Sequence, residues 1–152
     1  MQWDFDPATR QHLQRDGWRF KRNVDIAAIE AAWSKDGYTV FSAARRFARS
    51  FAGLTLRCPV DGGGYREMEL DPIVATRRLD PAAIPDCYEA AAGVRLLPVG
   101  MAHSGNVTVM AGDDGGFYAA ADSMFWRMGE RLETTLAAFY LNQRFVRVPL
   151  NS

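Results

Sequence analysis

Apolar residues in the first third of the chain recur at the spacing of a helix face. Ile26, Ile29 and Trp33 fall on one stripe, and the run from Ala44 to Phe51 repeats the pattern. A capping residue precedes each stretch and a glycine follows it. The pattern predicts three helices, which begin after or at Asp6, Asp25 and Ser42 and end before Gly17, Gly37 and Gly53.

From Leu54 onward, polar and apolar positions alternate instead. In YREMEL at 65–70, Met68 and Leu70 share one face of a strand, while Glu67 and Glu69 share the other. Similar runs follow, bounded by residues that favour turns. They predict strands at 54–60, 65–70, 95–100, 106–111 and 117–122, with turns at 61–64 and 112–116.

Helices interrupt and follow these strands. Asp71-Pro72 repeats the capping signal of Asp6-Pro7, CYEAAAG at 87–93 predicts a brief helix, and the prolines at 81 and 85 indicate a loop between them. A final helix is predicted from Met128, and the tail at 143–150 could add an edge strand that Pro149 limits. The order predicts an α+β fold: N-terminal helices followed by a mostly antiparallel sheet with short inserted helices and a C-terminal helix.

Composition narrows the class of protein. The 152 residues are 48% apolar and 24% charged, which suits one globular domain over residues 1–152. No apolar run is long enough to span a bilayer, and the N-terminus lacks the basic start and apolar core of a secretory signal, so we expect a cytoplasmic protein. Cys58 and Cys87 are far apart in sequence, and we expect two buried or half-buried thiols rather than a disulfide.

Charge is balanced overall but uneven along the chain. Residues 1–60 carry a net charge of +4, residues 61–122 carry −6 and residues 123–152 carry +2. The acidic middle segment disfavours binding to nucleic acid and suits a basic protein partner. Much of this charge is equally typical of a solvated acidic face.

The segment GDDGGFY at 112–118 has the composition of a metal or phosphate loop, but its spacing argues for a turn. A calcium loop that starts at Asp113 would need an oxygen ligand at its third position and a glutamate at its twelfth, where Gly115 and Met124 stand. A phosphate loop would need a lysine after its glycines, and aromatic residues follow instead. Asp-Gly and Gly-Gly favour a hairpin turn, which would leave Asp113 and Asp114 at the tip of a loop.

No other segment makes a strong case for catalysis. Gly62-Gly63-Gly64 begins a dinucleotide-like pattern, but the sixth position is Glu67. His103 could activate Ser104 or Cys87 as a nucleophile, yet the chain has two histidines and no Gly-x-Ser-x-Gly elbow. A small hydrolase that uses Asp113, Asp114 or His103 stays open as an alternative, and no metal or cofactor is predicted.

Several short motifs follow one another along the chain: Gly17-Trp18 with Arg22, Val24 and Asp25; Gly37-Tyr38; Phe51-Ala52-Gly53-Leu54; Leu70-Asp71-Pro72 with Ala75; Tyr88-Glu89 with Gly93; Leu97-Pro98-Val99-Gly100; Asp114-Gly115-Gly116-Phe117-Tyr118; and Gly129 with Leu132. In this order and spacing they resemble the third subgroup of the SUKH immunity-protein superfamily. The resemblance covers about Gly17 to Leu136, and it departs from the family pattern at Ala52, where a second glycine often stands. We expect the helix at 1–16 and the tail at 141–152 to lie outside it.

This resemblance implies a bacterial immunity protein that binds a cognate toxin domain and blocks it without chemistry of its own. A regulatory or scaffold protein of the same fold is the alternative. The resemblance supplies no catalytic or cofactor residues. Many such toxins attack nucleic acids with basic grooves, so an acidic surface would suit them. We expect a monomer or weak homodimer with six partner-binding residues: Asp61, Tyr65, Glu67, Glu69, Asp113 and Asp114.

Overall fold

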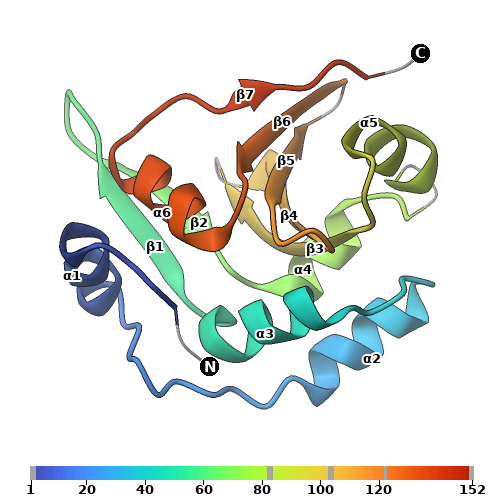
Figure 1. The fold of residues 1–152 in the computed structure, drawn as a ribbon, viewed down its shortest axis with the longest axis horizontal. Helices are drawn as coiled ribbons and strands as arrows, with labels where there is room; N and C mark the ends of the chain where they lie inside the picture. The colour runs from blue at the N-terminus through green and yellow to red at the C-terminus, as the bar shows by residue number, and fades with distance from the viewer. Residues whose placement is uncertain (1–2, 82–83, 103–104, 122, 151–152) are drawn as a thin grey trace.

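A computed structural model describes residues 3–81, 84–102, 105–121 and 123–150. Within these residues, three helices precede a seven-stranded antiparallel sheet whose strands neighbour one another in chain order. The fold class predicted from the sequence is therefore confirmed. The helices before the sheet are α1 (Pro7–Arg15), α2 (Ala27–Lys35) and α3 (Ser42–Phe51) (Figure 1). The strands are β1 (Thr55–Pro59), β2 (Tyr65–Glu69), β3 (Leu96–Ala102), β4 (Val107–Gly112), β5 (Phe117–Ala121), β6 (Met124–Gly129) and β7 (Val146–Arg147).

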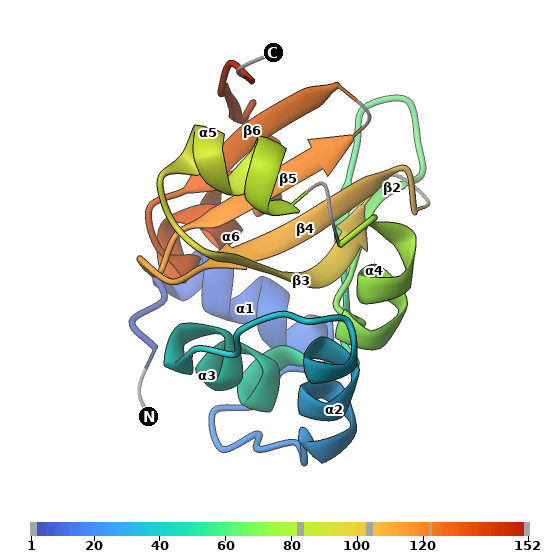
Figure 2. The same ribbon diagram turned by 90° about the vertical axis from the view of Figure 1, so that its right-hand side faces the viewer.

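In the described part of the chain, α-helices lie in two of the connections between strands. Between β2 and β3 lie α4 (Pro72–Arg78), a π-helix η1 (Ile84–Glu89) and α5 (Ala90–Ala92). Between β6 and β7 lies α6 (Leu132–Tyr140), which the curled sheet surrounds from β1 to β6 (Figure 1). Figure 2 shows α1, α2 and α3 on one side of the sheet and α5 on the other. The central strands are therefore covered on both faces.

Two hydrophobic clusters occupy these faces. The larger one joins the N-terminal helices and α6 to the sheet, and it includes Val109 and Ala111 of β4. The smaller one joins η1 and α5 to the other face, where Met110 and Tyr118 are buried. Successive side chains of a strand point to opposite faces, so β4 and β5 contribute to both clusters. This explains why β5 reads as an almost continuous apolar run.

Capping chemistry explains two of the predicted helix starts. The Asp6 carboxylate accepts a hydrogen bond from the Thr9 N–H at 2.9 Å, and Asp71 does the same for Val74 at 3.2 Å. The other two predicted caps were wrong. The helix caps are Ile26 and Phe41, neither of which makes a side-chain cap bond. Asp25, one residue before the cap of α2, accepts a hydrogen bond from the Ala27 N–H. Ser42 is already the first residue of α3.

Two further predictions about elements were wrong. The segment 124–129 is strand β6, so Met128 belongs to the sheet, and the last helix begins only at Leu132. A short stretch of apolar residues is compatible with the periodicity of a helix and with that of a strand, and here pairing with β5 stabilises the strand. The predicted loop around Pro85 is part of η1. A proline in the first turn of a helix is tolerated because its missing N–H would have no partner there.

Buried polar side chains tie the N-terminal helices to the sheet and to each other. The fully buried Trp33 donates its indole N–H to the Pro98 carbonyl of β3 at 2.9 Å. Trp3 and Trp18 both donate to the Ser50 hydroxyl oxygen of α3. A buried indole usually needs such an acceptor, because a buried donor without a partner is costly.

Candidate functional site

Four of the six predicted partner-binding residues lie on the β1–β2 hairpin. Asp61 lies in the connecting turn, and Tyr65, Glu67 and Glu69 alternate along β2. Tyr65 is 63% exposed, and both Asp61 and Glu69 are exposed. An exposed tyrosine is a common anchor in protein-binding surfaces, and acidic neighbours make such a surface complementary to a basic partner.

Glu67 is the one member of this group with an ion-pair partner among the described residues. Its carboxylate lies 2.7 Å from the Arg57 Nε on the neighbouring strand, directly opposite in the β1–β2 register. Both side chains are largely exposed, so the pair contributes little to stability. Hydrogen bonding to Glu67 and its charge raise the pKa of Arg57, which stays a cation. The remaining exposed acids give the hairpin its negative character.

The other two predicted residues lie in the turn between β4 and β5. The backbone closes this turn through hydrogen bonds from Gly112 to the Gly116 carbonyl and from Gly115 to the Gly112 carbonyl. Gly115 has a φ of 87°, which a side chain would disfavour. The sequence-based interpretation of GDDGGFY as a turn is confirmed.

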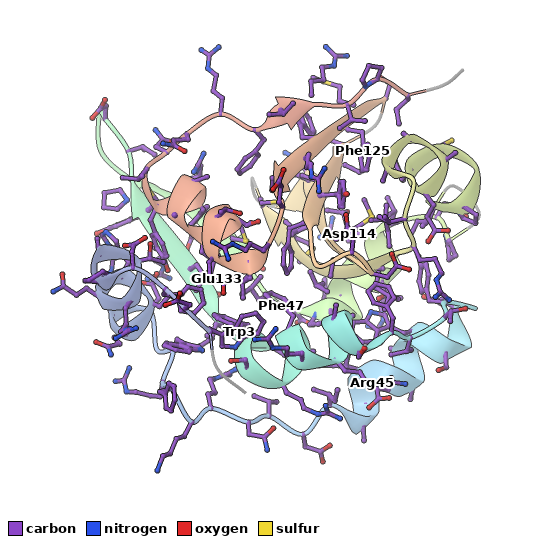
Figure 3. The ribbon with its side chains drawn as sticks, viewed as in Figure 1. Trp3, Arg45, Phe47, Asp114, Phe125 and Glu133 are labelled. Carbon is purple, nitrogen blue, oxygen red and sulfur yellow. The ribbon has the colours of Figure 1, made fainter. Side chains whose placement is uncertain are left out.

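Within this turn the two carboxylates have different surroundings. Asp114 accepts hydrogen bonds from the Gly116 N–H at 2.9 Å and the Tyr118 hydroxyl at 3.2 Å, and it lies 3.5 Å from the Arg127 guanidinium. The Asp113 carboxylate pairs with the Arg95 guanidinium at 3.2 Å. Asp114, which is labelled in Figure 3, thus holds the turn together, and its oxygens are already engaged.

The structure does not bring the two groups together. The hairpin residues Met68 and Glu69 pair with the end of β3 at Ala102. The β4–β5 turn lies near the opposite end of β3, because it directly follows Gly112, which pairs with Leu96. Strand β3 rises roughly 3.4 Å per residue, so the groups are separated by about 20 Å along the sheet. A partner could contact either group without touching the other.

A cavity of about 440 Å³ lies on the other face of the β1–β2 hairpin. The sheet from β2 to β6 forms its floor, and the segment from α6 to β7 borders it. Most of its lining is apolar, and the charged side chains that line it in the described part of the chain are arginines. The residues that line it are Arg66, Met68, Ala102, Val107, Val109, Ala119, Trp126, Met128, Phe139, Asn142, Gln143, Arg144 and Phe145.

Arg66 is the residue in this cavity that the sequence analysis missed. It alternates with Tyr65 and Glu67 along β2 and therefore points to the same face as the buried Met68. Its Nη2 donates to the Phe139 carbonyl, and its guanidinium lies 5.0 Å from the Phe139 ring centre. Its Nε is buried and makes no hydrogen bond to any described residue. A charge at an inward-facing strand position was the signal that could have identified it.

Candidate groups for chemistry are dispersed. Among the described residues, no cluster of three or more His, Cys, Asp or Glu side chains could hold a metal ion. Both cysteines are free thiols, and Cys58 is buried as predicted. The prediction was wrong for Cys87, which is exposed. The predicted His103 and Ser104 lie outside the described residues. Burial raises the pKa of Tyr118, and the nearby Asp114 adds to this shift, so the phenol stays protonated and donates to that carboxylate.

Comparison with known proteins identifies the family. The family model described as "SUKH-3 immunity protein" matches residues 5–142, a span that begins ahead of α1 and ends just after α6. Searches of curated proteins and of solved structures found no match. No helix among the described residues is both long and apolar enough to cross a membrane. Since the match covers most of its length, the chain belongs to the SUKH-3 family of immunity proteins.

Proposed function

We propose that this protein binds a cognate toxin domain and neutralises it by steric and electrostatic occlusion, without catalysing a reaction. The family match over residues 5–142 is the observation that carries the proposal. The acidic side chains of the β1–β2 hairpin, with the exposed Tyr65 among them, support a contact with a basic protein surface. We place this action in the cytoplasm, by a monomer or a weak homodimer.

The hairpin is the better of the two predicted contact regions. Glu69 is exposed and Asp61 lies free of regular structure in the turn, so both can approach a partner. The basic substrate groove of a nuclease toxin would meet these acids, and the Tyr65 ring would supply apolar contact area. Asp114 contributes less, because its oxygens already accept hydrogen bonds within the β4–β5 turn.

Electrostatic complementarity of this kind acts mainly on the rate of association. Opposite charges on two surfaces raise the association rate constant, and added salt reduces the effect within a Debye length of about 8 Å at physiological ionic strength. The proposal therefore predicts a complex whose formation slows as salt is added. Dissociation should depend more on Tyr65 and its apolar neighbours than on the acids.

The first experiment is co-expression with the product of the neighbouring gene, followed by co-purification. A stable complex in which the toxin is inactive supports the proposal. If no complex forms and the cell remains sensitive to the toxin, the proposal is wrong and a scaffold role of the same fold becomes the better explanation.

The second experiment locates the contact. The double variant Glu67→Ser/Glu69→Ser should slow association several-fold at low salt and flatten its dependence on ionic strength. Asp113→Ser is the matched control, because it removes an exposed acid about 20 Å away along the sheet. Equal association rates for all three proteins would exclude the hairpin acids as the steering surface.

A further inference from the structure

The cavity behind the β1–β2 hairpin combines an apolar lining with an arginine that has no counter-ion among the described residues. Its volume of about 440 Å³ is within the range of ligand-binding cavities, and aromatic and aliphatic side chains form most of its surface. The lining contains Arg66 and Arg144 and, among the described residues, no carboxylate. The cavity is therefore suited to an apolar group that carries a negative charge.

Arg66 is poorly compensated in its present surroundings. Burial lowers its pKa, and the nearby Cys58 only partly offsets this effect. One nitrogen donates to the Phe139 carbonyl, and the ring faces of Phe139 and Phe145 provide further weak contacts. The buried Nε remains without a hydrogen bond to any described residue. A carboxylate would satisfy this donor and neutralise the partly desolvated charge.

The rim of the cavity indicates a macromolecular partner. On the segment that follows α6, Leu141 directly precedes the lining residue Asn142 and is 68% exposed, among the large apolar residues that are most exposed in the described structure. Apolar surface around a cavity extends the contact beyond what a small ligand could cover, and such surfaces mark protein interaction sites.

We propose that this cavity anchors a protein partner through a short segment in which a large apolar side chain lies next to an acidic residue. The apolar side chain packs against Met68, Val109 and Trp126, and the carboxylate pairs with the Arg66 guanidinium. This inference deepens the proposed function and rests on it, because it assigns a second contact to the same toxin partner. The acidic outer face of the hairpin steers the partner, and the cavity on the inner face retains it.

The direct test is a titration of the full chain, ¹³C-labelled at its methyl groups, with blocked peptides. The probe is acetyl-Gly-Leu-Phe-Glu-Gly-amide, and the matched peptides carry Gln or Lys in place of Glu. The Glu peptide should shift the methyl signals of Ala102, Val109 and Met128 and bind roughly tenfold more tightly than the Gln peptide. Equal binding of the Glu and Gln peptides, or shifts elsewhere on the protein, would overturn the inference.

Variants separate the charge from the cavity. Arg66→Met replaces the guanidinium with an uncharged side chain of similar length, so it should abolish the preference for the Glu peptide over the Gln peptide. Ala102→Leu fills the cavity while Arg66 remains, and it should weaken all peptides together. Arg95→Met is the control, because Arg95 is an exposed arginine at the far end of β3. If 4-phenylbutyrate binds in the cavity but no peptide does, the site takes a small molecule and the inference is wrong.

The same variants distinguish this inference from the proposed function. If the toxin co-purifies with the wild-type chain and binds Arg66→Met and Ala102→Leu with unchanged affinity, the proposed function stands and the cavity is not its anchor. A ten-fold or greater loss with both variants, and none with Arg95→Met, supports the anchor. If no complex forms with the wild-type chain, the proposed function fails and the peptide titration alone decides whether the cavity binds acidic apolar segments.

Discussion

Asp114 provides a sharp test of whether an acidic residue in this chain serves the fold or the partner. Its carboxylate accepts hydrogen bonds from the Gly116 N–H and the Tyr118 hydroxyl and pairs weakly with Arg127. We expect Asp114→Ala to destabilise the fold and to leave toxin association unchanged. Asp114→Asn should be milder, because an amide oxygen can still accept the Gly116 N–H.

The magnitude follows from these contacts. A hydrogen bond to a charged acceptor contributes about 1.5–3 kcal/mol when it is buried. The Asp114 side chain is 31% exposed, and its ion pair with Arg127 is at 3.5 Å, so solvent screening reduces both effects. We therefore expect Asp114→Ala to lower the free energy of unfolding by about 2 kcal/mol. For a chain of this length, that corresponds to a drop in Tm of roughly 4–8 °C.

Thermal and urea unfolding, followed by circular dichroism, measure this difference. Asp113→Ala is the control, because the Asp113 carboxylate forms an ion pair with the exposed Arg95 and its loss should cost less than about 1 kcal/mol. If the two variants lose the same stability, the assigned role of Asp114 in the turn is wrong. If Asp114→Ala instead slows toxin association at unchanged stability, the turn is part of the binding surface.

Two further predictions concern the buried polar contacts. Trp33→Phe removes the N–H that satisfies the Pro98 carbonyl and leaves space in a fully buried site. It should therefore lower the free energy of unfolding in urea by about 2–4 kcal/mol. Trp126→Phe is the control at a half-buried position, and it should cost less than half as much. Burial raises the pKa of Tyr140, and its hydrogen bond to Asp16 adds to this shift. The stabilisation of the fold by the protonated Tyr140 is therefore fully present below the unfolded tyrosine pKa of about 10, and it is lost as pH rises through the folded pKa. Unfolding measured from pH 8 to 11 should therefore show a decline in stability that Tyr140→Phe reduces; an identical decline in both proteins would refute the assignment.

Much of the fold was predictable because its signals are local. The Asp-Pro pairs at the starts of α1 and α4 specify their own caps, and glycine with positive φ follows each of the first three helices. Strand β6 was not predictable in this way. Apolar residues between 124 and 139 fit a helix as well as a strand, and the choice depends on pairing with β5, which is not a local property.

In the candidate site, too, local features were predictable from the sequence and features that depend on distant residues were not. The turn at 112–116 was predictable, because its glycines specify the backbone whatever surrounds them. That the acids at 113–114 lie far from the hairpin was not, because the sequence does not give the order of strands in the sheet. The cavity at Arg66 is built from β2 to β6, α6 and the segment after it, so no single stretch of sequence carries its signature. Only the inward-facing position of Arg66 hinted at it.

The central claim is that this protein acts by occupying another molecule's surface. The most direct measurement is a titration of the cognate toxin's activity with increasing amounts of this protein at a toxin concentration well above the dissociation constant. The claim predicts a linear loss of activity that ends at a fixed molar ratio set by the complex, with full recovery of active toxin when the complex is dissociated. Complete inactivation by a small fraction of one equivalent, or a toxin that stays inactive after separation, would show a catalysed reaction and would contradict the claim.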